Sequence, residues 1–464
     1  MKTKHLLAAA VAVAPSVVMA SQPDIIYILA DDLGYADVGF NGSDIQTPNI
    51  DRIARQGVQL QNYYVCPVST PTRAGLMTGR YPIQFGLMRG VIKPYMDFGL
   101  DLDEQLLPEM LAEAGYNHRG CFGKWHLGHA RSEWWPHNRG FTEFVGCLNG
   151  ALDFFNHTRD GELDWHHNGE SLHEEGYATD LIANHAIEFI ESVPIDEPYF
   201  AYIPFNAPHA PIQAKKEDIA KYPNRSGKSA TYAAMVDCMD QNIGRILEVV
   251  EKRGNLDNTI IIFSSDNGGT GSADNGVMRG SKTYTYEGGI RVAACAMWPA
   301  GEVSGGQIIT ERMGYIDIFP TLRAAAYDGV AIPADHKPLD GRDVMPLMQG
   351  EQWRGKDRMW FSYLDHTDDS RMERLGVNYG KWKLVVTRPA PDNQQQPQPE
   401  TLCELFELNE QNQELEVVEN SKMEKLLLKE LKRFLAQKQQ ARVGRHTVAD
   451  QKSFEAPFEW RVKK

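Results

Sequence analysis

The sequence predicts an α/β fold, in which a large mixed, mostly parallel sheet is flanked by helices and a small C-terminal α+β subdomain adds an antiparallel sheet and one helix. Two apolar runs rich in β-branched residues, at 24–30 and 259–265, are typical of parallel strands buried on both faces. Segments with helical spacing lie between them. From about residue 350 the pattern changes to strands that partly alternate polar and apolar residues, which favours a separate antiparallel sheet.

Length and composition agree with a two-part globular protein. The chain has 464 residues, more than a single core usually serves, and 42% of them are hydrophobic and 24% charged. We expect a signal peptide at 1–20, a large domain at 21–350 and a C-terminal subdomain at 351–464.

The N-terminal segment has the features of a secretory signal. Lys2 and Lys4 precede an apolar run, and small residues before Ser21 are typical of a cleavage site. A membrane anchor is the alternative, but the run is short and Pro15 interrupts it. Because no later stretch is long and apolar enough to span a bilayer, we expect a periplasmic or secreted protein that is not held in a membrane.

The chain is strongly acidic. Its 48 basic and 62 acidic residues give a net charge of −14, and the loss of Lys2 and Lys4 with the signal leaves −16. Such a chain is a poor binder of nucleic acid or anionic membranes, and an anionic substrate would need a local basic pocket. The six cysteines form no C-x-x-C pair, so a zinc site is not expected. Disulfide pairing and oligomeric state cannot be read from the sequence.

Hydrophobic spacing predicts the other elements. An amphipathic helix begins at Thr47, and a Gln- and Pro-rich loop at 389–400 lies within the C-terminal sheet. Further helices are expected at 106–114, 176–192, 230–254 and 422–441, and further strands at 61–65, 199–204, 359–363, 376–379, 381–386 and 403–408.

A helix is also expected to begin at Ser69, in the stretch 69–80. Ser69 can cap its first turn and Pro71 suits that turn, whereas Gly79 ends the helix. The free N–H groups of a helix N-terminus attract anions, and Arg73 lies one turn from Ser69. One anion could therefore contact both side chains.

Oxygen-bearing side chains follow the two apolar runs. Asp31 and Asp32 come directly after the first run, and Asp266 and Asn267 follow the second. Because the sites of open α/β sheets lie at the carboxyl ends of strands, we expect these four residues to meet. Paired acids repel each other unless a cation lies between them, and hard oxygen ligands favour Ca²⁺ or Mg²⁺ over zinc. The alternative is that one acid caps a helix and the other is solvated.

Two lysines and two histidines are further candidates for chemistry. Lys124 and His126 are two residues apart, so on an extended segment they point the same way, and glycines lie on both sides of them. His209 stands between two prolines just past an expected strand, and Lys282 follows the second apolar run. The alternative for these residues is that the lysines are solvated and the histidines are packed.

Residues 129–175 are dense in aromatic and histidine side chains. Aromatic faces next to polar groups suit the binding of sugar rings, so we expect Trp165 and His167 to contact a carbohydrate. The alternative is that these side chains form the core of a partly exposed loop.

Taken in order, these motifs resemble the type I, formylglycine-dependent sulfatases of the alkaline phosphatase superfamily. The resemblance covers nearly the whole chain after the signal and rests on Asp31-Asp32, Ser69-x-Pro71-x-Arg73, Leu76-x-Thr78-Gly79-Arg80, Lys124-x-His126, His209, Asp266-Asn267 and Arg279-Gly280-Ser281-Lys282. It implies an alkaline-phosphatase-like catalytic domain and a hydrolase that cleaves sulfate monoesters with a bound Ca²⁺, Mg²⁺ being the less favoured ion.

The resemblance also implies how the ester is attacked. A maturation enzyme would oxidise Ser69, in a signature of the serine type, to formylglycine (3-oxoalanine), whose hydrate is the nucleophile. Cys66 is the alternative precursor, but Val68 stands where that interpretation needs a proline. The implied metal ligands are Asp31, Asp32, Ser69, Asp266 and Asn267.

The remaining matched residues have implied roles in the same reaction. Arg73, Lys124 and Lys282 would neutralise the sulfate oxygens, and such preorganised charge is usually the largest catalytic contribution. His209 would protonate the leaving alcohol, and His126 would take a proton from the second hydroxyl of the hydrate. The implied substrate contacts are Arg73, Lys124, His209 and Lys282.

Two other functions stay open. A phosphate or phosphonate monoester hydrolase of the same superfamily would use much of this site, and a non-catalytic glycan-binding protein would leave Ser69 unmodified. Export, the 129–175 segment and the acidic surface favour a sulfated polysaccharide or oligosaccharide as substrate, for example a carrageenan or a glycosaminoglycan. We expect small aryl sulfates to be hydrolysed as well.

Overall fold

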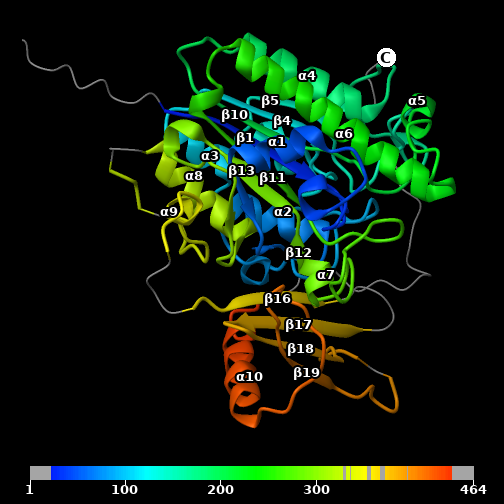
Figure 1. Ribbon diagram of the computed structural model, residues 1–464, viewed down its shortest axis with the longest axis vertical. Coiled ribbons are helices and arrows are strands. Elements are labelled where there is room, and N and C mark those ends of the chain that lie inside the picture. The colour runs from blue at the N-terminus through cyan, green and yellow to red at the C-terminus, as the bar shows by residue number, and fades with distance from the viewer. Residues whose placement is uncertain are drawn as a thin grey trace, which may run out of the picture.

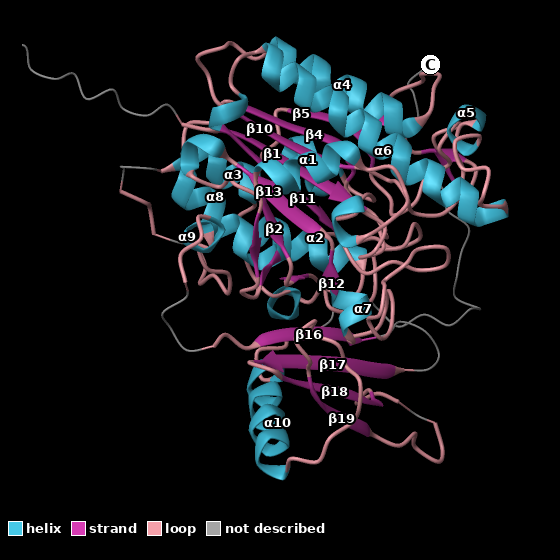
Figure 2. Cartoon of the chain, viewed as in Figure 1, coloured by secondary structure: helices cyan, strands magenta, loops and turns pink. Residues whose placement is uncertain are grey.

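The computed structural model describes residues 22–327, 331–334, 336–352, 357–365, 371–393 and 395–440. The expected signal peptide at 1–20 lies outside these residues. The described part has two regions, a large helix-flanked sheet and a smaller C-terminal sheet with one helix (Figures 1 and 2). Within those ranges we find no helix that combines the length and the apolar character needed to cross a membrane.

The large sheet has ten strands in the order β14-β2-β13-β11-β1-β10-β4-β5-β8-β9. The central strands from β11 to β5 run parallel, and the antiparallel strands β13 and β8 flank them. The strand bounds are β1 (Asp24–Ala30), β2 (Val58–Leu60), β4 (His118–Lys124), β5 (Glu143–Cys147), β8 (His166–His167), β9 (Glu170–Ser171), β10 (Tyr199–Pro204), β11 (Thr259–Ser265), β13 (Ala294–Met297) and β14 (Gln307–Ile309). The predicted mixed, mostly parallel sheet is confirmed.

The apolar run of β1 is completely buried because helices cover both faces of the sheet. Alternate side chains of a strand point to opposite faces, so Ile25 packs into one core and Ile26 into the other. On the face of Ile25 lie α2 (Ser69–Thr78), α3 (Leu107–Glu113) and α8 (Ile318–Ala326). On the face of Ile26 lie α1 (Pro48–Gln56), α4 (Ala178–Ser192) and α6 (Gly227–Lys252).

The C-terminal region is an antiparallel sheet with one helix, as predicted. Its strands are β16 (Trp360–Asp365), β17 (Met372–Tyr379), β18 (Trp382–Pro389) and β19 (Leu402–Glu407), and its helix is α10 (Ser421–Leu435). Phe434 of α10 stacks on Phe361 with ring centroids 4.6 Å apart and meets Tyr81 of the large region edge-on. Apolar packing therefore joins the two regions.

Shorter elements complete the described chain. They are β3 (Tyr63–Tyr64), β6 (Thr158–Arg159), β7 (Glu162–Leu163), β12 (Arg291–Val292), β15 (Met313–Gly314), α5 (Lys216–Ile219), α7 (Glu287–Ile290), α9 (Met345–Met348), and the 3₁₀ turns η1 (Gly39–Asn41), η2 (Pro82–Phe85), η3 (Ser132–Trp134), η4 (Pro136–Asn138), η5 (Leu256–Asn258), η6 (Pro299–Gly301) and η7 (Tyr315–Asp317).

Some predicted boundaries differ from the structure. The strand expected at 61–65 is the two-residue β3, and the helix expected at 422–441 ends at Leu435. The sequence pattern does not predict β13, whose residues Ala-Cys-Ala-Met include no β-branched side chain. The central position of β13 beside β11 determines its burial more than its own composition does.

Candidate active site

Most of the predicted site residues lie at or just beyond the carboxyl ends of the central parallel strands. Asp31 and Asp32 follow β1, and Asp266 and Asn267 follow β11, which pairs with β1 along its whole length. Lys124 ends β4, His209 follows β10, and α2 begins beside them with Ser69. Because parallel strands end at one edge of a sheet, residues as far apart as Asp32 and Asn267 meet there.

Ser69 is the first residue of α2, and its hydroxyl does not cap the helix. Val68 is the extended residue before the helix, and no side chain makes a cap hydrogen bond there. The Ser69 Oγ instead donates to Asp266 Oδ2 at 2.5 Å and accepts from Arg73 Nε at 2.9 Å. The predicted serine cap is therefore wrong, because charged groups across the site hold the hydroxyl. Gly79 does follow the helix, with a left-handed φ of 67°.

Four oxygen-bearing residues form a compact cluster. Asp32 Oδ1 accepts from Asn267 Nδ2 at 2.7 Å, and the Asp32 N–H donates to Asp266 Oδ1 at 3.3 Å. One carboxylate oxygen each of Asp31 and Asp32 and one ring nitrogen of His209 lie within 4.8 Å of one another. Asp31 Oδ1 and Asn267 Oδ1 are buried and accept no hydrogen bond from the described residues, although Arg73 Nη2 lies 3.8 Å from Asp31 Oδ1.

This cluster fits a hard divalent cation. Buried oxygens without a partner are rare, since each leaves the cost of its desolvation uncompensated, and a cation would compensate it. Carboxylate and amide oxygens are the ligands that Ca²⁺ and Mg²⁺ prefer. Burial and the charge of Asp266 raise the pKa of Asp31 to about 8, the direction expected for crowded acids.

Arg73 and Lys124 are completely buried among these acids. Arg73 donates through NH2 to Asp266 Oδ2 at 2.9 Å and through NH1 to the Lys124 carbonyl at 2.8 Å. Lys124 Nζ lies 2.5 Å from Asp31 Oδ2. Although burial alone would raise it, the charges of Arg73 and Lys124 hold the pKa of Asp266 far below its usual value. The two cations are thus fixed in a water-poor site where anionic oxygens are stabilised best.

Lys282 borders the cluster on its solvent side. Its Nζ lies 2.6 Å and 2.8 Å from the two carboxylate oxygens of Asp32, and its side chain keeps 17% of its surface exposed. Burial alone would lower the pKa of Lys282, but the charges of Asp32 and Asp31 raise it. Lys282 is therefore a protonated cation at the open side of the site.

His209 lies on the same open side. Its Nε2 is 3.6 Å from Asp32 Oδ2, and its side chain is 20% exposed. Its Nδ1 is 2.6 Å from the carbonyl of Ala210, so Nδ1 carries the hydrogen and Nε2 is free to exchange a proton. Burial lowers the pKa of His209 to about 4, and the charges of Lys124 and Lys282 add to this effect against that of Asp32.

The backbone holds the imidazole of His126 in one tautomer. Its Nε2 lies 2.9 Å from the carbonyl of Ile92 and carries the hydrogen, whereas Nδ1 is buried and has no hydrogen-bond partner among the described residues. Thr70 fixes this arrangement, because its hydroxyl donates to the His126 carbonyl at 3.1 Å and accepts from the Ile92 N–H at 3.2 Å. Burial lowers the pKa of His126 well below its usual value, and so do the charges of Lys124 and Arg73. His126 is therefore neutral, with Nδ1 as its proton acceptor.

Sequence reasoning misses the residues that position His126. Ile92 acts through its backbone, which leaves no side-chain signal, and Thr70 stands at an unspecified position of the Ser69 motif. Gly150 packs against the ring, where an added Cβ would lie 2.4 Å from its atoms. In the sequence, this contact could be suspected only from Gly150, a glycine with no evident role in a turn.

The two predicted carbohydrate contacts have different surroundings. Trp165 is completely buried, stacks on His157 with ring centroids 5.0 Å apart and donates its N–H to Glu174. His167 is half exposed on β8 and pairs with Glu143 at 2.7 Å. Because Trp165 offers no exposed face to a sugar ring, its burial favours the alternative interpretation, a loop core.

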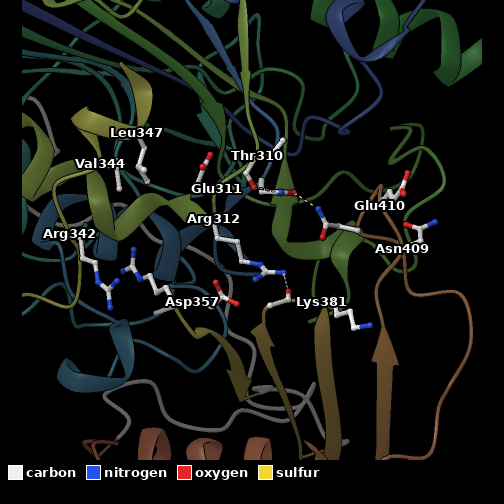
Figure 3. A pocket seen from close by; sticks show the side chains of 14 residues that line it. Thr310, Glu311, Arg312, Arg342, Val344, Leu347, Asp357, Lys381, Asn409 and Glu410 are labelled. Carbon is white, nitrogen blue, oxygen red and sulfur yellow. Dashed lines mark hydrogen bonds between the residues drawn. The ribbon is translucent and has the colours of Figure 1, made fainter. Parts of the chain in front are cut away.

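A cavity of about 480 Å³ lies apart from this cluster (Figure 3). It is bordered by α9, the β17–β18 turn and the segment after β19, and no predicted site residue lines it. Across it Arg312 donates to the Gly380 carbonyl, and Asn412 donates to Asn62 at 2.9 Å. The cavity therefore belongs to the seam between the two regions.

Family comparisons agree with this geometry. A profile described as "Sulfatase" matches residues 23–328, and one described as "N-sulphoglucosamine sulphohydrolase, C-terminal" matches residues 280–441. The chain is similar to a solved structure described as "Crystal structure of Ps i-CgsB in complex with k-i-k-neocarrahexaose", with a TM-score of 0.80 and 32% identity. That match covers 92% of this chain and 95% of the other.

Curated relatives point the same way. Arylsulfatase J of Mus musculus is 36% identical over 335 residues, which are 70% of this chain and 55% of the relative, so the chain spans little more than half of that relative's length. N-acetylgalactosamine-6-sulfatase of Homo sapiens is 34% identical over 373 residues, 74% of this chain and 69% of the relative. With a family profile over most of its length, and with these relatives, the chain belongs to the sulfatase family, whose members are sulfuric ester hydrolases.

Proposed function

We propose that the protein hydrolyses sulfate monoesters of a sulfated carbohydrate at the cluster around Ser69. The observation that carries this proposal is the meeting of three cations, Arg73, Lys124 and Lys282, with the oxygen-bearing cluster beside the Ser69 hydroxyl. A sulfate monoester bears negative charge, and cations held in place by the protein stabilise the charge that develops as the S–O bond breaks. Without them a chain of net charge −14 would repel such a substrate.

The proposed nucleophile is Ser69 after a maturation enzyme has oxidised its hydroxymethyl group to the aldehyde of formylglycine. An unmodified serine needs a base, and the hydrogen-bond partners of its hydroxyl among the described residues are Asp266 and Arg73, neither of which is an imidazole. The hydrated aldehyde supplies one hydroxyl that attacks sulfur and a second whose deprotonation expels sulfate. Position 69 is suited to this role because it is buried and bonded to Arg73 and to Asp266, whose carboxylate interacts with the charges of all three cations.

The proposed resident ion is Ca²⁺, with Mg²⁺ less favoured. The ligands would be Asp31, Asp32, Asp266, Asn267 and the modified Ser69. Support comes from one buried oxygen each of Asp31 and Asn267, neither of which accepts a hydrogen bond from the described residues. When bound there, the ion would supply positive charge that stabilises the sulfate oxygens and the attacking oxygen. The ends of β1 and β11 fix the ligands relative to one another.

Two histidines are proposed to move protons. His209 would protonate the leaving alcohol through Nε2, because Nδ1 already donates to the Ala210 carbonyl. A bound sulfate offsets the charges of Lys124 and Lys282, so it raises the pKa of His209 from about 4 toward the working pH. His126, neutral and fixed by Ile92, would accept a proton at Nδ1.

The proposed substrate is a sulfated polysaccharide or oligosaccharide, and small aryl sulfates serve as surrogates. The solved relative with 32% identity is described as a complex with k-i-k-neocarrahexaose, and a curated relative is named N-acetylgalactosamine-6-sulfatase. Carrageenan and glycosaminoglycan sugars are therefore the first to test. We further propose that 1–20 directs export to the periplasm or beyond, that 21–350 carries the catalysis and that 351–464 is a C-terminal subdomain.

Mass spectrometry of the Ser69 peptide, from protein made in its native host, tests the nucleophile. We expect the mass of the aldehyde or its hydrate at Ser69, and no sulfate release by a Ser69→Ala variant. Active protein with an intact serine would contradict the formylglycine mechanism. Inactive protein with an intact serine would favour a glycan-binding role.

Sulfate release tests the reaction and the ion. We expect kcat/KM for 4-nitrophenyl sulfate to exceed that for 4-nitrophenyl phosphate, and a large preference for phosphate would assign the other activity of the superfamily. Chelation with EGTA should abolish turnover, and Ca²⁺ should restore it better than Mg²⁺. Full activity after chelation would argue against a resident ion.

A further inference from the structure

The segment that carries Lys282 also holds two tyrosines, and an arginine packs on each. Tyr284 is 39% exposed, and its ring stacks with that of Tyr286, with centroids 6.2 Å apart and planes at 25°. Arg374 of β17 places its guanidinium carbon 4.0 Å from the ring centre of Tyr284, and Arg279 lies 4.2 Å from that of Tyr286. We call Arg374, Tyr284, Tyr286 and Arg279 the arginine–tyrosine ladder.

The two arginines of the ladder differ in charge balance. Arg279 forms an ion pair with Glu404 at 2.9 Å. Arg374 has no carboxylate within ion-pair distance among the described residues, and its hydrogen bonds run from NH1 to the Thr283 carbonyl at 2.7 Å and to the Thr283 hydroxyl at 3.3 Å. Its Nε and NH2 donate to no residue in the described ranges. On a chain of net charge −14, this partly exposed guanidinium is suited to an anion that a ligand brings.

The ladder adjoins the open side of the cluster around Ser69. Thr283 directly follows Lys282, and its N–H donates at 2.8 Å to the carbonyl of Pro67, two residues before Ser69. The Lys282 side chain keeps 17% of its surface exposed, whereas Arg73 has none, so a substrate reaches the cluster from the Lys282 side. A sugar bound beside Lys282 therefore lies next to the ladder.

We propose that Arg374 binds a second anionic group of the substrate, a sulfate or carboxylate on the sugar next to the one that is desulfated. This inference rests on the proposed function and narrows its substrate to glycans with several charges. The ring of Tyr284 holds the guanidinium plane in place, so little rotamer freedom is lost when two ligand oxygens bind it side by side. Arg279, already neutralised by Glu404, supports the stack from its far end.

Arg374 also has a structural contact that the experiment must separate from binding. It holds the carbonyl of Thr283, a residue with a left-handed φ of 75° directly after Lys282. Loss of this contact would move Lys282 and lower turnover of every sulfate ester alike. Loss of an anion contact would lower turnover mainly of substrates that carry the second charge.

The test compares two carrageenan tetrasaccharides that share the scissile sulfate and differ in one sulfate on the neighbouring sugar. For Arg374→Ala we expect the ratio of kcat/KM, doubly over singly charged, to fall about tenfold, mostly through KM, as for one charge-assisted hydrogen bond. Arg374→Lys should recover part of the ratio, because an ammonium cannot bind two oxygens as a planar fork does. The matched control is Arg433→Ala, an exposed arginine of α10 paired with Glu430 at 2.6 Å, which should leave the ratio unchanged.

An unchanged ratio in Arg374→Ala overturns the inference, and so does an equal loss with both tetrasaccharides. Wild-type protein that releases sulfate from neither tetrasaccharide, and from no glycosaminoglycan sugar or aryl sulfate either, would instead contradict the proposed function. Calorimetry on a Ser69→Ala background, with the doubly charged tetrasaccharide, then decides the inference without turnover. About tenfold weaker binding after Arg374→Ala supports it, and equal binding overturns it.

Discussion

At Ser69 the hydroxyl lies between a carboxylate oxygen at 2.5 Å and a guanidinium nitrogen at 2.9 Å. Such neighbours orient the hydroxyl but do not deprotonate it, because the charges of Arg73 and Lys124 make Asp266 a very weak base. The other titratable groups of the described cluster include two imidazoles, whose pKa values burial lowers, and the carboxyl of Asp31, whose pKa burial raises. The Ile92 carbonyl fixes the tautomer of His126, so this ring can take up a proton only at Nδ1.

We predict that Thr70→Val impairs this tautomer control. The variant keeps the shape of the side chain but loses the bonds to the His126 carbonyl and the Ile92 N–H, so the Ile92 carbonyl is no longer held under the imidazole. We expect kcat to fall about tenfold, the effect of roughly one lost hydrogen bond, with little change in KM. Steady-state kinetics over a range of pH measure this effect. We expect the acidic limb of the profile of kcat against pH to shift relative to wild type.

Thr231→Val is the matched control, since the Thr231 hydroxyl only donates to the Gly227 carbonyl within α6. It should change neither kcat nor the pH profile. A Thr70→Val enzyme with wild-type kcat would show that the ring is held adequately by packing, for instance by Gly150.

How far the sequence predicts this site depends on what each residue contributes. Side chains that act through their own charge, such as Asp32, Lys124 and Lys282, stand in recognisable motifs and meet as expected. Residues that act through their backbone atoms, such as Ile92, cannot be recognised from the type of their side chain. Trp165 shows the reverse case, because an aromatic side chain suits a sugar site and a buried core equally well.

Among the helices, the contact between α1 and α6 resembles a cap made by a neighbouring element. Thr47 makes no side-chain cap on α1, and Asp240 of α6 instead accepts from the N–H groups of Asn49 at 3.1 Å and Ile50 at 2.8 Å. These are N–H groups of the first turn, which have no partner within their own helix. Burial nevertheless raises the pKa of Asp240 to about 6.

We predict that Asp240→Asn changes how stability depends on pH. Because the folded-state pKa lies above the unfolded one, folded Asp240 binds more protons between about pH 4 and 6, and wild-type unfolding free energy falls as pH rises through this window. The amide does not titrate, so the variant should gain about 2 kcal/mol relative to wild type between pH 4 and pH 7. Urea unfolding at both pH values measures the change. The control is Asp196→Asn at an exposed position, which should leave the pH dependence of the unfolding free energy as it is in wild type. If the unfolding free energies of Asp240→Asn and wild type changed equally with pH, the burial argument would be contradicted.

The elements differ in how well their sequences specify them. β1 and β11 are continuous apolar runs, and their parallel pairing follows from burial on both faces. β13 is inserted antiparallel beside β11 and takes its place from long-range pairing, which local propensity does not encode. Sheet order beyond the central strands was therefore not predictable.

Across the whole molecule, a buried charge cluster joins the two regions. Lys383 of β18 lies 2.7 Å from Glu287 of α7 and 2.7 Å from Glu414, and all three are buried. Although burial alone would raise it, Lys383 and Arg291 lower the pKa of Glu287 to about 2. Burial and the charge of Glu287 raise the pKa of Glu414 to about 7. The ammonium group of Lys383 thus pairs with two carboxylates where the two regions meet.

We predict that Lys383→Met destabilises the protein by about 3–5 kcal/mol at neutral pH, because it leaves two buried carboxylates without their shared cation. The deficit should shrink in acid, where the carboxylates become protonated, and a second change, Glu287→Gln, should recover part of it. Urea unfolding measures both. The control is Lys422→Met, at the exposed start of α10. If Lys383→Met lowered the unfolding free energy by less than about 1 kcal/mol, this would show that water or repacking relieves the buried charges.

The contacts of β17 and β18 with the segment 279–291 indicate how the substrate preference of related chains could change during evolution. The side chains proposed to handle sulfate are encoded before residue 292, whereas Arg374 and Lys383, which contact that segment from β17 and β18, are encoded after residue 370. With the role proposed for Arg374, mutations in the later stretch would alter which neighbouring sugars are accepted and would leave the groups proposed to handle sulfur intact. Related chains could therefore keep one chemistry and differ in the glycans that they accept, provided that a cation opposite Glu287 is kept.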